Sequence, residues 1–197
     1  MRLPHPTSPS VLAYIFWHWK RDDVDAAAYE SALRGFHDAL RDAPSVGLLS
    51  ASCDALRGAP WACQGGDAYE DWYVVRSSAD LDPLNDAAVS AARQAPHDAA
   101  AAFAAGGTAG LYRLRLGSVS VAGVHEAWFG KPAGWAYPQL YARLQPIVDG
   151  VGASLWGRQM TLGPAHEFCL RSEAPVMLPE ELDPVRLLLR AVFRHDA

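Results

Sequence analysis

The 197-residue sequence is short of three things: cysteine, long apolar runs and basic charge. Its three cysteines are an odd number and do not stand at zinc-ligand spacing, so we expect free thiols and no bound metal. The longest apolar run near the N-terminus, residues 11–17, is too short to cross a bilayer and lacks the cleavage pattern of a signal peptide. A formal net charge of −5 argues against a nucleic-acid-binding surface. We therefore expect a cytoplasmic protein with neither a membrane nor a nucleic-acid partner.

The sequence also lacks the motifs that commonly identify a reaction. It has no nucleophile elbow, no dinucleotide fingerprint and no HExxH motif, and Gly65-Gly66 lacks the lysine and hydroxyl residue of a phosphate-binding loop. A haem protein would need a proximal histidine. His37, His97 and His195 lie on or near expected helices, but none has a recognisable haem-binding context. We expect a protein without a tightly bound cofactor.

What the sequence does contain is an internal repetition. Three landmarks occur twice in the same order: residues 15–20 resemble 127–131, residues 74–77 resemble 169–172, and residues 81–83 resemble 182–184. An amphipathic segment follows the first landmark both times. This repetition predicts a duplicated βαββα unit. We expect a flexible tail at residues 1–10, a first unit at 11–117 and a second unit at 118–197.

Hydrophobic periodicity predicts the elements of each unit. In the first unit we expect strands at residues 11–20, 45–53, 69–77 and 111–116. A helix should carry Tyr29, Leu33, Phe36 and Leu40 on one face, and a further helical region should begin at Asp82, break at Pro96 and close at Gly106-Gly107. In the second unit we expect strands at 125–131, 153–161 and 166–172 and helices at 137–148 and 184–193. The pattern shows no fourth strand there, so either the second sheet has three strands or the alignment of the two halves is wrong at that point.

A β-α-β-β-α-β order is the ferredoxin-like motif, an antiparallel sheet with helices on one face. Its other face has to be covered, and two copies in one chain can cover each other. In this pattern the chain resembles the dimeric α+β barrel superfamily, which includes antibiotic-biosynthesis monooxygenase-like and EthD-like proteins. The resemblance extends over nearly the whole length. It implies an α+β fold of tandem ferredoxin-like repeats, with antiparallel sheets packed face to face as a pseudo-dimeric barrel.

Strand alternation sorts the side chains between the two sheet faces. In the first strand, residues 13, 15 and 17 are expected under the helices, and Tyr14, Phe16 and His18 on the opposite face. In the third strand, Tyr73 and Val75 are expected in the core, and residues 70, 72, 74 and 76 on the opposite face. A cavity between the two sheets would then have aromatic walls and a few orienting polar groups, as small-molecule sites do. Its expected ligand-binding residues are Tyr14, Phe16, Trp72, Arg76, Phe129, Lys131, Trp156, Arg158 and Arg171. Its expected catalytic residues are His18, Glu70 and Glu167, whose side chains can exchange protons.

The main functional hypothesis is that the protein binds or modifies a small aromatic or anionic molecule in that cavity, because Arg76 or Arg171 could bind a carboxylate. Two structural explanations stay open: the arginines reach water at strand ends, or they pair with glutamates across the interface between the units. A second hypothesis is an assembly protein or homodimer, in which loop residues Trp61 and Trp135 form contacts or cover a pocket. A third, implied by the superfamily resemblance, is a haem-binding or monooxygenase-like enzyme.

Overall fold

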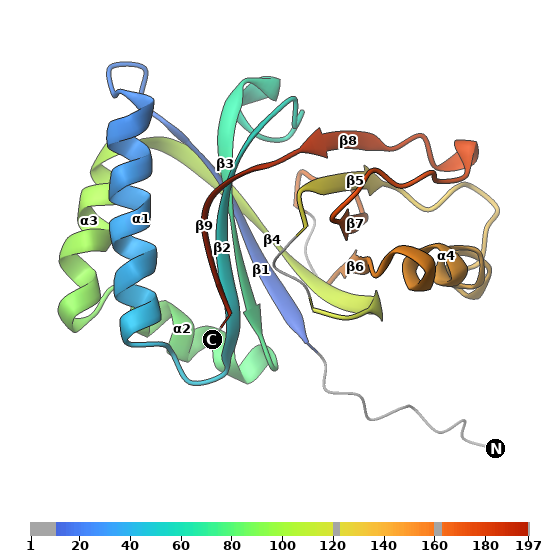
Figure 1. The fold of residues 1–197 in the computed structure, drawn as a ribbon, viewed down its shortest axis with the longest axis horizontal. Helices are drawn as coiled ribbons and strands as arrows, with labels where there is room; N and C mark the ends of the chain where they lie inside the picture. The colour runs from blue at the N-terminus through green and yellow to red at the C-terminus, as the bar shows by residue number, and fades with distance from the viewer. Residues whose placement is uncertain (1–10, 120–122, 160–162, 197) are drawn as a thin grey trace.

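The computed structural model describes residues 11–119, 123–159 and 163–196, so the tail expected at residues 1–10 lies outside the described part. Within these ranges, antiparallel strands form one nine-stranded sheet, with four α-helices on its outer sides (Figure 1). The strands are β1 (Leu12–Lys20), β2 (Leu48–Arg57), β3 (Asp67–Val75), β4 (Ala104–Gly117), β5 (His125–Phe129), β6 (Ser154–Arg158), β7 (Phe168–Ser172), β8 (Val185–Leu188) and β9 (Arg190–Asp196). The helices are α1 (Ala26–Asp42), α2 (Leu81–Ala88), α3 (Gln94–Phe103) and α4 (Tyr137–Val151). None of these helices is long and apolar enough to cross a membrane.

The strand order is β8-β5-β7-β6-β4-β1-β3-β2-β9. The sections β4-β1-β3-β2 and β8-β5-β7-β6 follow the same order when each is counted from its own first strand. Pairing of β4 with β6 joins the sections, and β9 extends the first section beyond β2. One continuous sheet replaces the two separate sheets that the sequence led us to expect. Strand β8 takes the place of the fourth strand that was not predicted for the second half.

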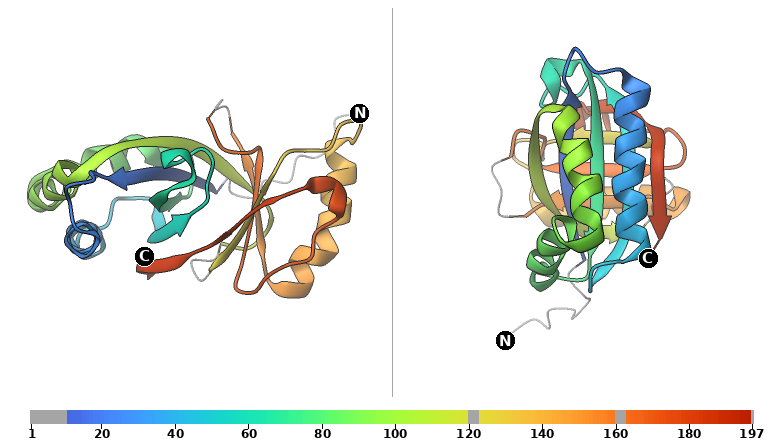
Figure 2. Two further views of the ribbon diagram at one scale, coloured as in Figure 1. Left: turned by 90° about the horizontal axis from the view of Figure 1, so that it is seen from above. Right: turned by 90° about the vertical axis from the view of Figure 1, so that its left-hand side faces the viewer.

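The sheet folds back on itself, so that its two sections face each other between α1–α3 on one side and α4 on the other (Figure 1). Figure 2 shows α1 and α3 side by side over the outer face of the first section. Between the sections lies a core of tryptophans, which we call the inter-section core. In it the ring centroids of Trp17 and Trp128 are 5.5 Å apart, as are those of Trp72 and Trp156. These edge-to-face contacts fill the space in which the sequence placed a cavity.

The two faces of β1 are reversed relative to the sequence prediction. Ile15 and Trp17 belong to the inter-section core, whereas Tyr14, Phe16 and His18 point towards the helices. Alternation fixes which residues share a face, but it does not fix which face the helices cover. The correction matters for function because it moves His18 from the inter-section side to the helix side.

Two predicted elements differ from the structure. The helix expected at residues 184–193 is instead two strands, β8 and β9. Arg186 of β8 pairs with Ala127 of β5, and Phe193 of β9 pairs with Cys53 of β2. Leucine and arginine favour a helix locally, but sheet pairing with distant strands overrides that preference. The third repeat landmark therefore opens α2 in the first half and precedes a strand in the second. Gly106-Gly107, expected to end a helix, lies inside β4.

The amphipathic helix of the first half is confirmed. Tyr29, Leu33, Phe36 and Leu40 are buried along α1, and the Asp25 carboxylate caps the helix by accepting a hydrogen bond from the Ala27 amide at 2.9 Å. This cap fixes where α1 begins, and hence which of its side chains lie over β1 and β3.

Candidate ligand cavity and its buried histidine

A cavity of about 500 Å³ lies between the first sheet section and helices α1–α3. Its walls are mainly aromatic and aliphatic, with contributions from Tyr14 and Phe16 of β1 and Phe36 of α1. Asp82 and Asn85 of α2 are exposed and line it as well. No lysine or arginine is among the described residues that line this cavity. An apolar pocket of this size is typical of small-molecule sites, which measure roughly 300–1,000 Å³.

The polar part of the cavity wall centres on His18, whose side chain is almost fully buried. Its ring stacks against Phe16 at 5.2 Å and against Tyr69 at 5.7 Å between centroids. The Nδ1 atom lies 2.7 Å from the hydroxyl of Tyr29, and the Nε2 atom lies 3.5 Å from a carboxylate oxygen of Asp71. The imidazole is therefore held on both sides, by a helix residue and by a strand residue.

Asp71 is the centre of a wider hydrogen-bond network. His37 Nε2 lies 3.0 Å from one carboxylate oxygen, and the Tyr73 hydroxyl donates to the other at 2.9 Å. Burial alone would raise the pKa of Asp71, but His37 and His18 outweigh it and hold that pKa well below its usual range. Asp71 is therefore a buried carboxylate on the helix side of the sheet whose ionised form is favoured by its neighbours.

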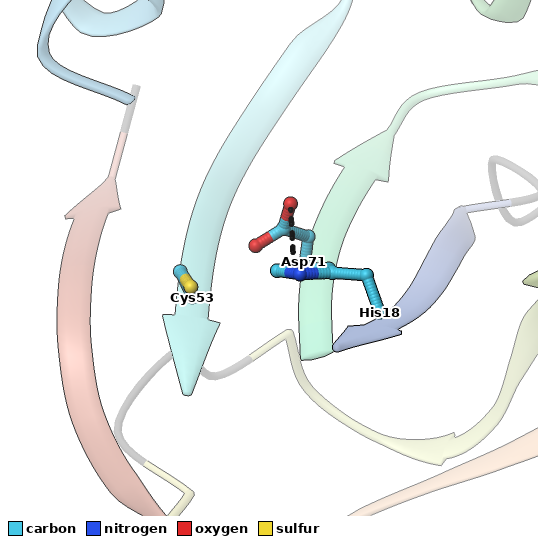
Figure 3. A group of neighbouring side chains, drawn as sticks. All are labelled: His18, Cys53 and Asp71. Atoms are coloured by element: carbon cyan, nitrogen blue, oxygen red, sulfur yellow. Dashed lines mark ion pairs between the residues drawn. The ribbon is translucent and has the colours of Figure 1, made fainter. Parts of the chain in front are cut away.

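Cys53 completes this cluster (Figure 3). It lies directly opposite Asp71 in the β2–β3 register, so both side chains are on the same sheet face. Burial, followed by the nearby Asp71 carboxylate, raises the pKa of the Cys53 thiol well above its ordinary value. One ligand-type atom from each of His18, Cys53 and Asp71 lies within 4.8 Å of the other two.

A second buried polar cluster occupies the inter-section core. Arg171 of β7 lies 2.8 Å from Glu126, 3.1 Å from Asp54 and 3.7 Å from Glu70. Glu70 also accepts a hydrogen bond from the Trp72 indole at 2.8 Å. This arrangement is the cross-interface pairing that the sequence left open, since Arg171 belongs to the second half and its partners Asp54 and Glu70 to the first.

The electrostatics of this second cluster follow from its burial. Desolvation and the neighbouring Glu126 raise the pKa of Glu70 well above its ordinary value, and desolvation raises the pKa of Asp54 to about 6. Burial would lower the pKa of Arg171, but Glu126, Glu70 and Asp54 outweigh it. The cluster therefore combines a charged arginine with carboxyl groups that retain protons more readily than they do in water.

The structure brings only part of the sequence-predicted site together. Tyr14, Phe16 and His18 border the cavity. Glu70, Trp72, Trp156 and Arg171 lie in or beside the inter-section core instead. The remaining predicted residues are dispersed: Arg76 is exposed, Phe129 packs under α4, Lys131 donates to the Trp135 carbonyl, Arg158 donates to the Ala165 carbonyl, and Glu167 accepts from the Tyr137 hydroxyl.

The loop tryptophans also differ from expectation. Trp61 packs against Trp17 and Trp128 at centroid distances of 6.0 and 5.2 Å, so it caps the inter-section core. Trp135 lies under the guanidinium of Arg143, 4.3 Å from the ring centroid. Neither residue lines the cavity.

From the sequence we identified Tyr29 only as part of an apolar helix face, and we did not identify Asp71 or Cys53 as site residues. One signal was available: Asp71 shares its strand face with Tyr73 and Val75, which were predicted to be core. A carboxylate at a core position is costly unless it is paired, so it indicates a buried polar site.

His18 does not fit an axial haem ligand, because such a ligand needs a ring nitrogen with room in front of it for the flat macrocycle. Nδ1 of His18 lies 2.7 Å from the Tyr29 hydroxyl and Nε2 lies 3.5 Å from the Asp71 carboxylate, so side chains occupy that space on both sides.

No protein-family model and no curated protein matches the sequence. Solved structures do match: a protein from Fusobacterium nucleatum provisionally named a monooxygenase has a TM-score of 0.65, with 95% of this chain and 94% of that chain covered at 9% identity. A Lactobacillus acidophilus protein of the same provisional name has a TM-score of 0.61, with 95% and 96% covered at 9% identity. An anthrone oxidase-like protein has a TM-score of 0.56, with 96% and 94% covered at 9% identity.

The chain shares the fold of these neighbours over nearly its whole length. The superfamily resemblance inferred from the sequence stays a prediction beyond this likeness of fold. Identity of 9% carries nothing further about the reaction.

Proposed function

We propose that the protein binds a small, neutral, largely aromatic molecule in the cavity under α1–α3, with one oxygen atom of the ligand directed at Tyr29. The single observation that supports this most is the composition of the cavity wall. It is built of rings and aliphatic side chains around one buried polar cluster, the His18–Tyr29 pair with Asp71 beside it. The absence of lysine and arginine from the described lining argues against the anionic ligand considered from the sequence.

Tyr29 is the residue through which the pair would contact a ligand. Its hydroxyl can donate one hydrogen bond and accept others. One of these is used by His18 Nδ1 at 2.7 Å, and the tyrosine itself lines the cavity. His18 would then act as a positioning residue: Asp71 holds its ring, and the ring orients the Tyr29 hydroxyl.

Binding is testable with anthrone and 2-naphthol as probes, followed by isothermal titration. Tyr29→Phe should weaken binding about 5- to 15-fold, the effect of one lost hydrogen bond. The matched control is Tyr141→Phe, on α4 outside the cavity, which should bind as the wild type does. Ala88→Phe, which fills the cavity from α2, should abolish binding, whereas Ala142→Phe, exposed on α4, should not. Equal affinity in wild type and Ala88→Phe would contradict the proposal.

A second candidate is oxidation of the bound molecule by dioxygen, favoured by the names of the fold neighbours. In the simplest balanced form, R-CH2-R′ and O2 give R-CO-R′ and water. An oxygen electrode with anthrone as substrate tests it directly. Consumption above the uncatalysed rate that disappears in Ala88→Phe supports oxidation, and an unchanged background rate limits the protein to binding. The assembly hypothesis loses support because Trp61 packs, half-buried, against the inter-section core. A homodimer stays a prediction that light scattering can test.

We further propose that residues 11–117 and 118–197 descend from one duplicated unit. The shared strand order of the two sheet sections supports this. In the second half a 3₁₀ turn at Glu180–Leu182 stands where α2 and α3 stand in the first. There Val176, Leu178 and Leu182 pack on the α4-side core and close it. Duplication followed by this loss explains why the proposed ligand site belongs to the first half.

A further inference from the structure

We infer that His18, Cys53 and Asp71 form a site for a divalent metal ion with tetrahedral preference, such as Zn²⁺ or Co²⁺. The three residues come from the adjacent strands β1, β2 and β3, with β3 in the middle (Figure 3). All three are buried, and their ligand-type atoms lie within 4.8 Å of one another. Rigid strands thus present an imidazole nitrogen, a sulfur and a carboxylate oxygen to one point, the donor types that zinc prefers.

The distance between His18 and Asp71 supports a shared ion. Nε2 and the carboxylate oxygen are 3.5 Å apart, beyond the 2.7–3.2 Å of an ordinary hydrogen bond, and Nε2 has no hydrogen-bond partner. Two ligands each about 2.1 Å from one tetrahedral ion are about 3.4 Å apart. A buried nitrogen without a hydrogen-bond partner, on a side chain that is 2% exposed, is costly, and a metal ion would satisfy it.

The side chains around the cluster hydrogen-bond to its members as residues next to metal ligands usually do. A metal-bound histidine usually donates its other N–H to an oxygen, and His18 Nδ1 lies 2.7 Å from the Tyr29 hydroxyl. Asp71 is hydrogen-bonded by His37 and Tyr73, which fix the orientation of its carboxylate. Both ligands are therefore oriented by contacts that do not depend on the ion.

Charge also favours the assignment. A divalent ion displaces the thiol proton of Cys53, and the thiolate and the Asp71 carboxylate together neutralise the ion in a buried site. Sulfur and nitrogen donors disfavour Mg²⁺ and Ca²⁺, which take oxygen ligands. His18 and Asp71 border the cavity whereas Cys53 does not, so an open coordination position would face the cavity. Three protein ligands with one open position is the pattern of catalytic rather than structural zinc. The inference goes beyond the proposed ligand binding and does not depend on it.

Cobalt titration of the chelator-treated protein tests the site. We expect one Co²⁺ per chain, tetrahedral d–d bands in the visible range and a thiolate-to-cobalt band in the near ultraviolet, all removed by excess Zn²⁺. Cys53→Ser should lose the thiolate band and weaken Co²⁺ binding by more than about 100-fold, a larger effect than loss of an outer-shell partner. The matched control, Cys63→Ser, removes the exposed free cysteine and should leave the spectrum unchanged.

Circular dichroism and anthrone titration of Cys53→Ser separate a folding defect from loss of the site. If Cys53→Ser is folded and keeps the wild-type cobalt spectrum, or if the folded wild type binds no Co²⁺, the metal site is overturned. Because Cys53 does not line the cavity, anthrone binding should survive this substitution. A cobalt spectrum without anthrone binding in the wild type would contradict the proposed function alone.

Discussion

The guanidinium of Arg171 lies over the indole ring of Trp72, 4.2 Å from its centroid, although the two residues come from different halves of the chain. Arg171 also reaches Asp54 of β2, so one side chain of β7 contacts two strands of the first section. A buried cation that stacks on an aromatic ring and pairs with carboxylates fixes the relative position of both. We infer that this contact fixes how the two sheet sections are positioned against each other.

Substitution of Arg171 should therefore destabilise the whole molecule. Arg171→Leu leaves Glu126, Asp54 and Glu70 buried without their shared cation, which should lower the free energy of unfolding by about 3–5 kcal/mol. Urea denaturation measures it. Arg76→Leu, an exposed arginine, is the control and should change stability by no more than about 0.5 kcal/mol. Similar values for the two variants would refute a structural role for the buried pairings.

The same cluster should make stability depend on pH. Because burial and Glu126 raise the pKa of Glu70, the folded protein keeps a proton there at pH values where the unfolded chain has lost it. Stability from this group is then present below the unfolded pKa of about 4.3 and is lost as the pH rises through the window up to the raised folded pKa. Glu70→Gln has no proton to lose, so its unfolding free energy should fall less steeply than that of the wild type as the pH rises above about 4.3.

Urea unfolding at several pH values checks this, with Glu167→Gln as control. Glu167 is not part of the cluster and accepts a hydrogen bond from Tyr137 of α4, so its variant should keep the wild-type slope. Parallel curves for wild type and Glu70→Gln would show that Glu70 is ionised in the folded protein.

Local patterns predicted most of the fold because most elements are defined by their own sequence. The apolar spacing along α1 identified its buried face, and alternation in β3 correctly separated Trp72 from Tyr73. Residues 184–193 were misassigned because leucine and arginine suit a helix, and only pairing with β5 and β2, far away in the chain, makes them strands. Nothing in the sequence of that segment itself indicates a strand.

The site was less predictable than the fold. His18 was identified from its chemistry, but its surroundings depend on two facts that no local pattern contains. One is that the helices cover its face of β1. The other is the β2–β3 register that places Cys53 opposite Asp71. A shift of one residue would move either side chain to the inter-section core.

The hydrogen bond from His37 to Asp71 should contribute strongly to stability. His37→Phe keeps the ring stacked on Tyr73 and Phe193, at 5.7 and 5.0 Å, but removes the N–H group near the buried carboxylate. We expect a loss of about 2–3 kcal/mol in urea unfolding, the cost of leaving a buried charge with one donor fewer. His97→Phe, a partly exposed histidine of α3, should cost less than about 0.5 kcal/mol. If His37→Phe leaves the free energy of unfolding unchanged, packing and not hydrogen bonding accounts for the contribution of His37 to stability.

Gly107 tests the link between the sheet and the cavity. A Cβ on this residue would lie 2.5 Å from the ring of Phe16, which lines the cavity, and 2.9 Å from the Trp17 carbonyl oxygen. Gly107→Ala should thus destabilise the protein by about 1–3 kcal/mol and weaken anthrone binding, because the Phe16 ring has to shift. Gly130→Ala, where a Cβ meets nothing within 4 Å, should do neither.

The double variant Gly107→Ala/Phe16→Leu decides whether the clash is the cause. A shorter side chain at position 16 removes the ring that the new methyl group would meet. The double variant should therefore lose less stability than the sum of the two single variants, by about 1 kcal/mol or more. If the stability losses of the two single variants simply add, the cost of Gly107→Ala arises from the backbone contact with the Trp17 carbonyl. A shift of the Phe16 ring would then not be the cause of weaker anthrone binding.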